Sequence, residues 1–454
     1  MNLYRKGAAA LLAALLFCCA CQGAETPHDE SPAPSGEART LSIYTLGSSP
    51  FQAPDIATFG LAYPNATVQL RTFDWQTERE KYYEQLKVEL MSGTAPDLFD
   101  ATGIRMAEYA DSGYLANFNA IIEQDETFDR EDCYANVFDA LAYKGGLYRF
   151  PLDFGYSFIS VNESISNAQT AAFRARSAIS YPELIKLYNG MTEDERKAYE
   201  LETNFRPAQA LVLAAPEYID FEAEACDFNN ASLIQLLKDS KAASNPERYN
   251  KLVYTYSSDS FLSDTTNAKL FAFYQHEVFA TQYFLPYEEN YYTHSIPLTD
   301  AAGNILVQPY NSFAISAASP NRDLAWAFLK FAALSGSASN AAGASLSSIP
   351  ICRSVAQAQI LQNTVKFIRA SETHPDMPVF LPNRTAEEKI AYAEEVWQQL
   401  DAYNQAPMAI MQDFLTDEDT GLLLNEYDLF YKDMKSAEDA AAAIQNKMSL
   451  KLKE

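Results

Sequence analysis

Three cysteines near the N-terminus have the spacing that most directly suggests a chemical role. Cys18, Cys19 and Cys21 follow an apolar run over residues 7–17, which is preceded by two basic residues. Such a run is too short to span a bilayer, but it is long enough for the apolar part of a secretory signal. A cysteine placed directly after that run is the residue that lipoprotein maturation acylates. We therefore expect lipid attachment at this end of the chain.

Cys21 is the cysteine that we expect to carry the lipid. Small residues precede the acceptor cysteine in lipoprotein signals, and Cys21 follows Ala20, whereas Cys18 follows a bulky aromatic residue. Cys19 remains the second candidate, and an ordinary signal peptide cut near Ala20 or Ala24 remains the alternative. The expected signal peptide covers residues 1–20.

Residues 21–39 have the composition of a disordered tether. They contain Pro27, Pro32 and Pro34 among Gly, Ser, Glu and Asp, without apolar periodicity. A segment of this kind cannot bury enough apolar surface to fold. Fully extended, it would reach on the order of 50 Å. Signal and tether together predict a protein that is lipid-anchored on the extracytoplasmic face of the cell membrane.

The rest of the chain offers no recognised catalytic or metal-binding motif. It lacks the GxSxG, HExxH, phosphate-loop and dinucleotide fingerprints, and its 4 histidines are far apart. Cys133, Cys226 and Cys352 are odd in number and lack zinc spacing, so we expect mostly buried thiols. The acidic segment 417–421 lacks the third ligand and the closing Glu of a calcium loop, and we expect a solvated turn there. We accordingly expect no enzyme activity, no cofactor and no metal.

The charge and the size of the chain bound its function further. With 34 Lys and Arg against 60 Asp and Glu, the formal net charge is −26. A chain this acidic repels nucleic acid and anionic headgroups, so we expect no nucleic-acid partner. About 415 residues follow the tether, which is more than one hydrophobic core usually takes, and this predicts two domains.

The elements that must position any site begin with an α/β rhythm. Residues 41–46 and 66–71 alternate apolar and polar residues and predict strands. Residues 76–92 predict a helix, with Tyr83, Leu86 and Leu90 on one stripe. A short buried strand over 96–100 and a helix over 105–112 follow, the order typical of a lobe with a mostly parallel sheet.

Later segments continue with both kinds of element. We predict strands over 154–162 and 313–316, a helix that starts at Ser319 and Pro320, and a last helix capped by Ser436. Residues 170–300 show little clear strand alternation, and we expect them to be richer in helix.

Six segments in order along the chain carry a recognisable pattern. They are AYPNATVQL (62–70), LMSGTAPDLFD (90–100), EYADSGYLANFNAII (108–122), ALAYKGGLYRFPLDFGYSFISVN (140–162), FAISAASPNRDLAWAFLKF (313–331) and SAEDAAAAIQNKMSLKLKE (436–454). This series resembles a known family, the extracellular solute-binding proteins of ABC importers in the maltose-binding-protein-like group. The six segments lie in the family's order and span most of the chain after the tether. This order makes the resemblance specific, although each segment alone is a weak signal.

The resemblance implies an α/β fold of the two-lobed, periplasmic-binding-protein-like type II. Two hinge-linked lobes would hold a ligand in the cleft between them and close on binding. The lobes would be discontinuous, with residues 40–152 plus 308–348 in the first lobe and 153–307 plus 349–454 in the second.

Site residues are then expected where strands end toward the other lobe and where the chain crosses between lobes. The candidates are polar or aromatic side chains that can bond to sugar hydroxyls or stack on a pyranose ring: Ser48, Asp100, Thr102, Asp153, Tyr156, Tyr256, Tyr310 and Asn311. For each of them a hinge or turn role without ligand contact is the alternative. Trp326 and Trp397 are expected to pack in the core, while Trp75 either reaches the cleft or covers the sheet edge.

The function implied by the resemblance is that of a lipid-anchored receptor that captures a sugar or short oligosaccharide and delivers it to ABC permease subunits. We expect the receptor to be a monomer. Binding of a cationic ligand such as a polyamine or a peptide is one alternative. A surface glycoside hydrolase is another, because 60 acidic residues supply carboxylate pairs in any case.

Overall fold

The computed structural model describes residues 37–162, 165–202, 211–212, 214–220, 222–243, 268–274, 294–335, 348–362, 385–410 and 417–453. Cys21, Tyr256 and most of the tether lie outside these residues. The described residues from Arg39 onward belong to one unit. In the part of the chain that is described, no helix is long and apolar enough to cross a membrane.

Parallel strands form the start of the fold. β1 (Arg39–Leu46) lies between β2 (Ala66–Phe73) and β3 (Leu98–Asp100) and pairs with both in parallel. The predicted alternation is observed, because Leu41 and Ile43 of β1 are fully buried on one face. Leu46 packs on the opposite face of the sheet.

Helices cover both faces of these strands. α2 (Ala53–Ala62) and α14 (Arg322–Ser335) pack on the face of Leu41 and Ile43, where the ring centroids of Phe59 and Phe328 lie 5.0 Å apart. α3 (Arg79–Ser92) packs on the other face and ends at Gly93, whose φ of 71° is left-handed. Its fully buried residues are Tyr82, Leu86 and Leu90, so the predicted stripe holds except that Tyr82 takes the place of Tyr83.

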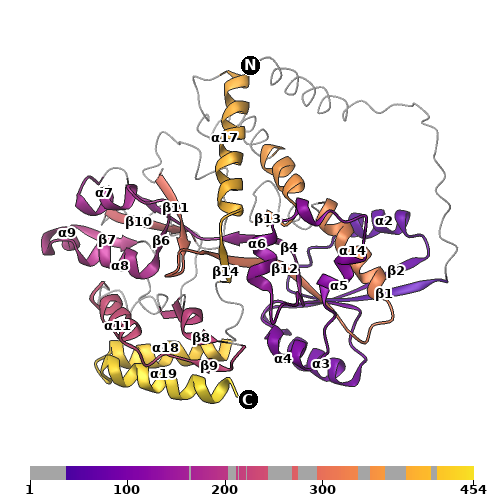
Figure 1. The fold of residues 1–454 in the computed structure, drawn as a ribbon, viewed down its shortest axis with the longest axis horizontal. Helices are drawn as coiled ribbons and strands as arrows, with labels where there is room; N and C mark the ends of the chain where they lie inside the picture. The colour runs from indigo at the N-terminus through magenta and orange to yellow at the C-terminus, as the bar shows by residue number, and fades with distance from the viewer. Residues whose placement is uncertain are drawn as a thin grey trace. The chain divides into compact units, whose positions relative to one another are not determined.

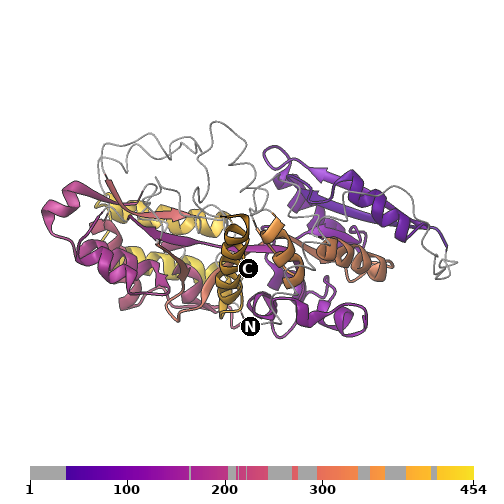
Figure 2. The ribbon, with the colours of Figure 1, turned by 90° about the horizontal axis from the view of Figure 1, so that it is seen from above.

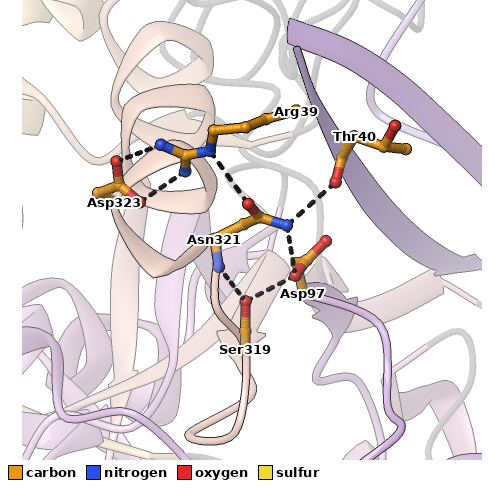
Figure 3. Close-up of polar contacts among 6 residues, drawn as sticks. All are labelled: Arg39, Thr40, Asp97, Ser319, Asn321 and Asp323. Carbon is orange, nitrogen blue, oxygen red and sulfur yellow. Dashed lines mark hydrogen bonds and ion pairs between the residues drawn. The ribbon is translucent and has the colours of Figure 1, made fainter. Parts of the chain in front are cut away.

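A polar cluster joins the first strand to the start of α14 (Figure 3). Arg39 donates two hydrogen bonds to the Asp323 carboxylate at 2.7 and 2.8 Å, and its Nε donates to the Asn321 Oδ1 at 3.1 Å. The Ser319 hydroxyl donates to the buried Asp97 carboxylate at 2.6 Å. Helix α14 therefore begins at Arg322, later than predicted, because Ser319 closes the preceding turn by accepting from the Asn321 N–H at 3.0 Å.

Three antiparallel strands lie at the centre of the sheet (Figure 1). β4 (Phe150–Tyr156) pairs with both β12 (Ile305–Ile315) and β13 (Ile349–Pro350). The C-terminal part of β12 pairs with β3, where Phe313 is the partner of Asp100. The N-terminal part of β12 pairs with β14 (Met408–Ile410). The predicted strand at 154–162 is thus divided at Ser157 between β4 and β5 (Phe158–Val161).

A second core is built from later segments. In this part of the sheet β11 (His294–Thr299) lies between β12 and β5, and β6 (Ile179–Ser180) pairs with β11. β10 (Ala268–Tyr274) and β7 (Tyr199–Glu202) extend the sheet beyond β5. The helices of this core are α7 (Ala168–Arg174), α8 (Tyr181–Asn189), α9 (Glu193–Ala198), α11 (Ala231–Ala243), α18 (Asp417–Tyr431) and α19 (Ala437–Lys451). α18 and α19 lie side by side in both views (Figures 1 and 2). The described part of residues 170–300 is richer in helix, as expected, but it also holds strands that show no clear alternation in the sequence.

The remaining elements are short, apart from one long helix. They are α4 (Met106–Asp111), α5 (Phe118–Glu123), the 3-10 turns η1 (Arg130–Asp132) and η2 (Ala215–Tyr218), α6 (Ala135–Leu141), β8 (Ile219–Asp220), β9 (Ala225–Cys226) and α17 (Ala386–Asn404). Ser436 caps α19 as predicted, because its hydroxyl accepts from the Asp439 N–H at 3.0 Å. Ile349, Cys352 and Trp397 pack in the core of β1 and β4. The expected domain boundary after residue 348 stays a prediction.

Candidate functional site

The carboxyl ends of β1, β2 and β3 meet at one edge of the sheet. Leu46 and Phe73, the last residues of β1 and β2, are direct partners in the parallel register. Asp100 ends β3, and its carboxylate accepts from the Leu46 N–H at 3.3 Å. The loops that follow the three strands are therefore neighbours, in the position where open α/β sheets bind ligands. We refer to these loops, residues 47–49, 74–77 and 101–103, as the strand-end edge.

Asp100 organises this edge from inside. The side chain is buried, and its second contact is the Thr102 N–H, 2.8 Å from Oδ1. Burial raises the pKa of the Asp100 carboxyl, while the hydrogen bonds from Thr102 and Leu46 act in the opposite direction. The Asp100 carbonyl accepts from the Tyr82 hydroxyl at 2.5 Å. Asp100 thus holds two strand ends in place, and direct contact with a ligand stays a prediction for it.

Ser48 and Thr102 lie exposed on the loops that Asp100 organises. Gly47, with a φ of 76°, turns the first loop, and its N–H donates to the Phe73 carbonyl at 2.8 Å. The Thr102 carbonyl accepts from the Tyr83 hydroxyl at 3.1 Å, and the residue is exposed. Both hydroxyls can exchange hydrogen bonds with a polar solute.

Trp75 adds an aromatic surface to the same edge. Its side chain is 43% exposed, and a Cβ built on Gly47 would lie 3.6 Å from the Trp75 Cβ. The Arg79 guanidinium lies 5.3 Å from the indole centroid. A surface cavity of about 450 Å³ is lined here by Trp75, Gln76, Thr77, Arg79 and Glu80. Trp75 therefore lies at the strand ends with its side chain 43% exposed, and its contact with the cleft stays a prediction.

The loop that carries Trp75 is fixed by Asp74. The Asp74 Oδ1 accepts from the Thr77 hydroxyl at 2.8 Å and from the N–H groups of Thr77 and Gln76 at 2.9 and 3.1 Å. These bonds, that of the Thr77 hydroxyl foremost, lower the pKa of Asp74. Sequence reasoning missed Arg79 and Gln76, although an Asp followed by Thr at the third position after a strand is a usable turn signal.

The crossing strands bring a second group of predicted residues close to this edge. The Ala101 N–H donates to the Ser312 carbonyl at 2.8 Å, so the loop after β3 adjoins Asn311. The Asn311 Nδ2 donates to both oxygens of Asp153 at 3.0 and 3.1 Å, and the Ser348 hydroxyl donates to the same carboxylate at 2.7 Å. Asp153 is fully buried, and this burial raises its pKa to about 6.

Tyr310 is half-buried and lies against Gly155. A Cβ built on Gly155 would lie 2.8 Å from the Tyr310 ring, so only glycine leaves room for that ring. Asn311 has a φ of 42°, which turns the strand at the point where its amide reaches Asp153. The Tyr310 ring and the Asn311 backbone thus mark the place where β12 leaves regular strand geometry.

Tyr156 belongs to a different set of contacts. Its ring is 1% exposed, and its hydroxyl donates to the Asn404 Oδ1 at 2.9 Å. The Asn404 Nδ2 donates in turn to the Tyr134 hydroxyl at 3.2 Å, and that hydroxyl donates to Asp401 at 3.1 Å. This buried chain joins β4 to the end of α17. Ligand contact by Tyr156 stays a prediction, and the observed bonds give it a positioning role.

Acidic residues at 417–421 do not form the expected solvated turn. They begin helix α18, and Asp419 is buried with an ion pair of 2.9 Å to Arg105. Among the described residues, no three His, Cys, Asp or Glu side chains lie close enough together to hold a metal ion.

Comparison with known proteins gives one family match. The family model described as bacterial extracellular solute-binding protein matches residues 44–338. Comparison with curated protein sequences finds no match.

Solved structures resemble the chain over nearly its whole length. The sugar-binding protein MalE from Xanthomonas citri has 13% sequence identity and a TM-score of 0.62, with 91% of this chain and 98% of that chain covered. A family 1 extracellular solute-binding protein from Alicyclobacillus acidocaldarius has 15% identity and a TM-score of 0.59, with 92% and 100% covered. An ABC substrate-binding protein from Listeria monocytogenes, solved in complex with cycloalternan, has 14% identity and a TM-score of 0.53, with 91% and 99% covered. At these identities the likeness shows the fold.

Proposed function

Because the chain belongs to the bacterial extracellular solute-binding proteins of family 1, which serve ABC transporters, we propose that it captures a carbohydrate, either a sugar or a short oligosaccharide. The fold predicted from the sequence, a mixed α/β fold of the two-lobed type II, is confirmed. The ligand, the anchor and the closing motion are the parts that we propose here.

The half-exposed indole of Trp75 at the strand-end edge is the observation that carries the carbohydrate proposal. A flat apolar ring bordered by hydroxyl, amide and guanidinium groups suits a pyranose, which has an apolar face and a rim of hydroxyls. The Arg79 guanidinium lies 5.3 Å from the indole centroid, and Ser48 and Thr102 are exposed on the other two loops of the strand-end edge. The sugar-binding Xanthomonas relative and the Listeria relative solved with cycloalternan support the same ligand class.

The residues predicted from the sequence divide into two roles in this proposal. Ser48, Thr102 and Tyr310 contact the ligand, together with Trp75. Asp100, Asp153, Asn311 and Tyr156 hold the loops and crossing strands in place through their hydrogen bonds. Tyr256 lies outside the described residues and remains a predicted contact from the second lobe.

Closure would complete the site. We place the lobes at 40–152 plus 308–348 and at 153–307 plus 349–454, with β4, β12 and β13 as the crossing strands. A ligand that bonds to both lobes favours the closed state, because only differential affinity shifts such an equilibrium. The closed form would then deliver the solute to ABC permease subunits. The receptor would act as a monomer, held at the extracytoplasmic membrane face by a lipid on Cys21, and would have no catalytic activity.

A thermal-shift panel tests the ligand class. Binding to the native state alone stabilises by about 2.7 kcal/mol at a hundredfold excess over Kd. We expect at least one mono- or oligosaccharide to raise the melting temperature, and polyamines and peptides to leave it unchanged. The carbohydrate proposal fails if only the cationic ligands raise it. Release of a reducing end from a glycoside would instead support the hydrolase alternative.

A further inference from the structure

Two cysteines that are far apart in the sequence face each other in the first core. Cys133 and Cys352 are separated by 219 positions, and their Sγ atoms lie 3.6 Å apart. Both side chains are buried, at 7% and 1% exposure. The two residues form an isolated antiparallel bridge, so their backbones run directly opposite each other.

The surrounding backbone holds the two residues in this position. The Tyr134 N–H donates to the Ile351 carbonyl at 3.2 Å, and the Ile351 N–H donates to the Leu152 carbonyl of β4 at 3.0 Å. On the other side, the Ser354 N–H donates to the Asp132 carboxylate at 3.0 Å. Hydrogen bonds thus link the two chain segments on both sides of the Cys133–Cys352 pair and hold the thiols together.

The geometry is compatible with a covalent bond. Directly opposed residues of an antiparallel pair have Cα atoms about 4.5–5.5 Å apart, within the range of about 4.4–6.8 Å that disulfides span. Rotation of the two side chains can shorten the Sγ–Sγ distance from 3.6 Å to the length of a disulfide, about 2.05 Å, at a Cα separation in that range.

We propose that Cys133 and Cys352 form a disulfide in the exported protein. Disulfides persist outside the cytoplasm, where this family acts. The oxidant would be the disulfide of a thiol–disulfide oxidoreductase or of a small molecule. Thiol–disulfide exchange joins the two Sγ atoms and breaks two S–H bonds. The oxidant's disulfide takes up the two electrons and two protons and becomes two thiols.

The timing of oxidation follows from the environment of the thiols. Contact with the Cys352 thiol and burial raise the pKa of Cys133 far above its ordinary value. Exchange needs the thiolate, so the folded pair reacts slowly. The bond therefore forms during folding, before the core closes, and resists reductants once the protein is native.

The bond would join the segment before α6 to the segment after β13. It would thus tie the Cys133 segment to the segment that pairs with crossing strand β4. Cys226 provides an internal contrast, because its Sγ lies 3.3 Å from the Ser449 hydroxyl and packs beside the second core. A specific pairing would leave Cys226 as a free thiol.

Peptide mapping tests the bond in the full-length protein exported by a bacterial host. The protein is unfolded without reductant in iodoacetamide, digested and mapped by mass spectrometry. We expect the Cys133 and Cys352 peptides as one linked species, two hydrogens lighter than their sum, with Cys226 alkylated. Separate alkylated Cys133 and Cys352 peptides, both in exported protein and in protein refolded with oxidised glutathione, would overturn the proposal, as would a link to Cys226.

Melting temperatures give a second readout. Reductant added during unfolding should lower the melting temperature of the wild type and of Cys226→Ser by on the order of 5 °C. Reductant should leave the melting temperatures of Cys133→Ser and Cys352→Ser unchanged, because these variants cannot form the disulfide. An equal response of all four proteins would contradict the assignment, and the mapping of the wild type decides the question if a variant does not fold.

Discussion

Gly47 and Trp75 meet at the carboxyl ends of neighbouring parallel strands, where a Cβ on Gly47 would lie 3.6 Å from the Trp75 Cβ. The register of β1 and β2 produces this contact, because Leu46 and Phe73 are partners and the next residues turn out of the sheet together. The indole is thereby held at the edge of the sheet with 43% of its surface exposed. Position and exposure together make Trp75 the centre of the proposed site.

Replacing Gly47 should strain the loop next to this ring. Gly47 has a φ of 76°, where an L-residue costs roughly 1–2 kcal/mol. We expect Gly47→Ala to lower the free energy of unfolding by about that amount in a urea titration. Gly60→Ala is the matched control, because Gly60 lies inside α2 with open space around it and alanine favours helix. Equal stability of the two variants would contradict the strained turn.

The buried carboxyl of Asp153 should make stability depend on pH. Its pKa is raised from 3.8 to about 6 in the folded state, mainly by burial. Its contribution to stability is therefore fully present below about pH 4 and is lost as the pH rises through 6. The expected loss is about 3 kcal/mol, from 1.36 kcal/mol per pKa unit.

Urea titrations of the wild type and Asp153→Asn at pH 4, 5, 6 and 7 measure this loss. The asparagine cannot ionise, so the difference in unfolding free energy between the two proteins should change by about 3 kcal/mol in favour of the variant as the pH rises. A difference that is constant across this range would show that Asp153 does not titrate there.

Tyr156 should matter for stability more than for binding. Removing its hydroxyl leaves the buried Asn404 Oδ1 without this donor, which costs about 1–3 kcal/mol. We expect Tyr156→Phe to lower the melting temperature and to keep the ligand affinity within about twofold of the wild type. A large loss of affinity with unchanged stability would restore Tyr156 as a direct ligand contact.

Much of the fold could be predicted because its elements alternate or carry caps. β1 and β2 alternate between more and less buried positions along most of their length, and Ser436 caps α19. The later strands were missed for a physical reason. From Ser295 to Thr299, β11 is buried at every position, so it has no polar face that could produce an alternating pattern.

The candidate site could be predicted only in part. Strand ends identified Asp100 and Thr102, but the position of Trp75 depends on the register between two strands, which no local pattern fixes. The facing of Cys133 and Cys352 was hidden for the same reason, since 219 positions separate them. Asp100 and Tyr156 carry polar groups that could form hydrogen bonds with a ligand. In the structure these groups instead form hydrogen bonds with Leu46, Thr102 and Asn404.

Isothermal titration of the best carbohydrate from the panel into wild type, Trp75→Ala and Leu61→Ala tests the central claim most directly. Leu61 is 84% exposed near the end of α2, and it precedes the first residue of β2, whereas Trp75 follows the last residue of that strand. It serves as the control for loss of a large exposed side chain. Loss of a stacking platform should weaken binding by about tenfold or more in Trp75→Ala, with Leu61→Ala within about twofold of the wild type. Unchanged affinity in Trp75→Ala, or no heat of binding from any carbohydrate, would contradict the account.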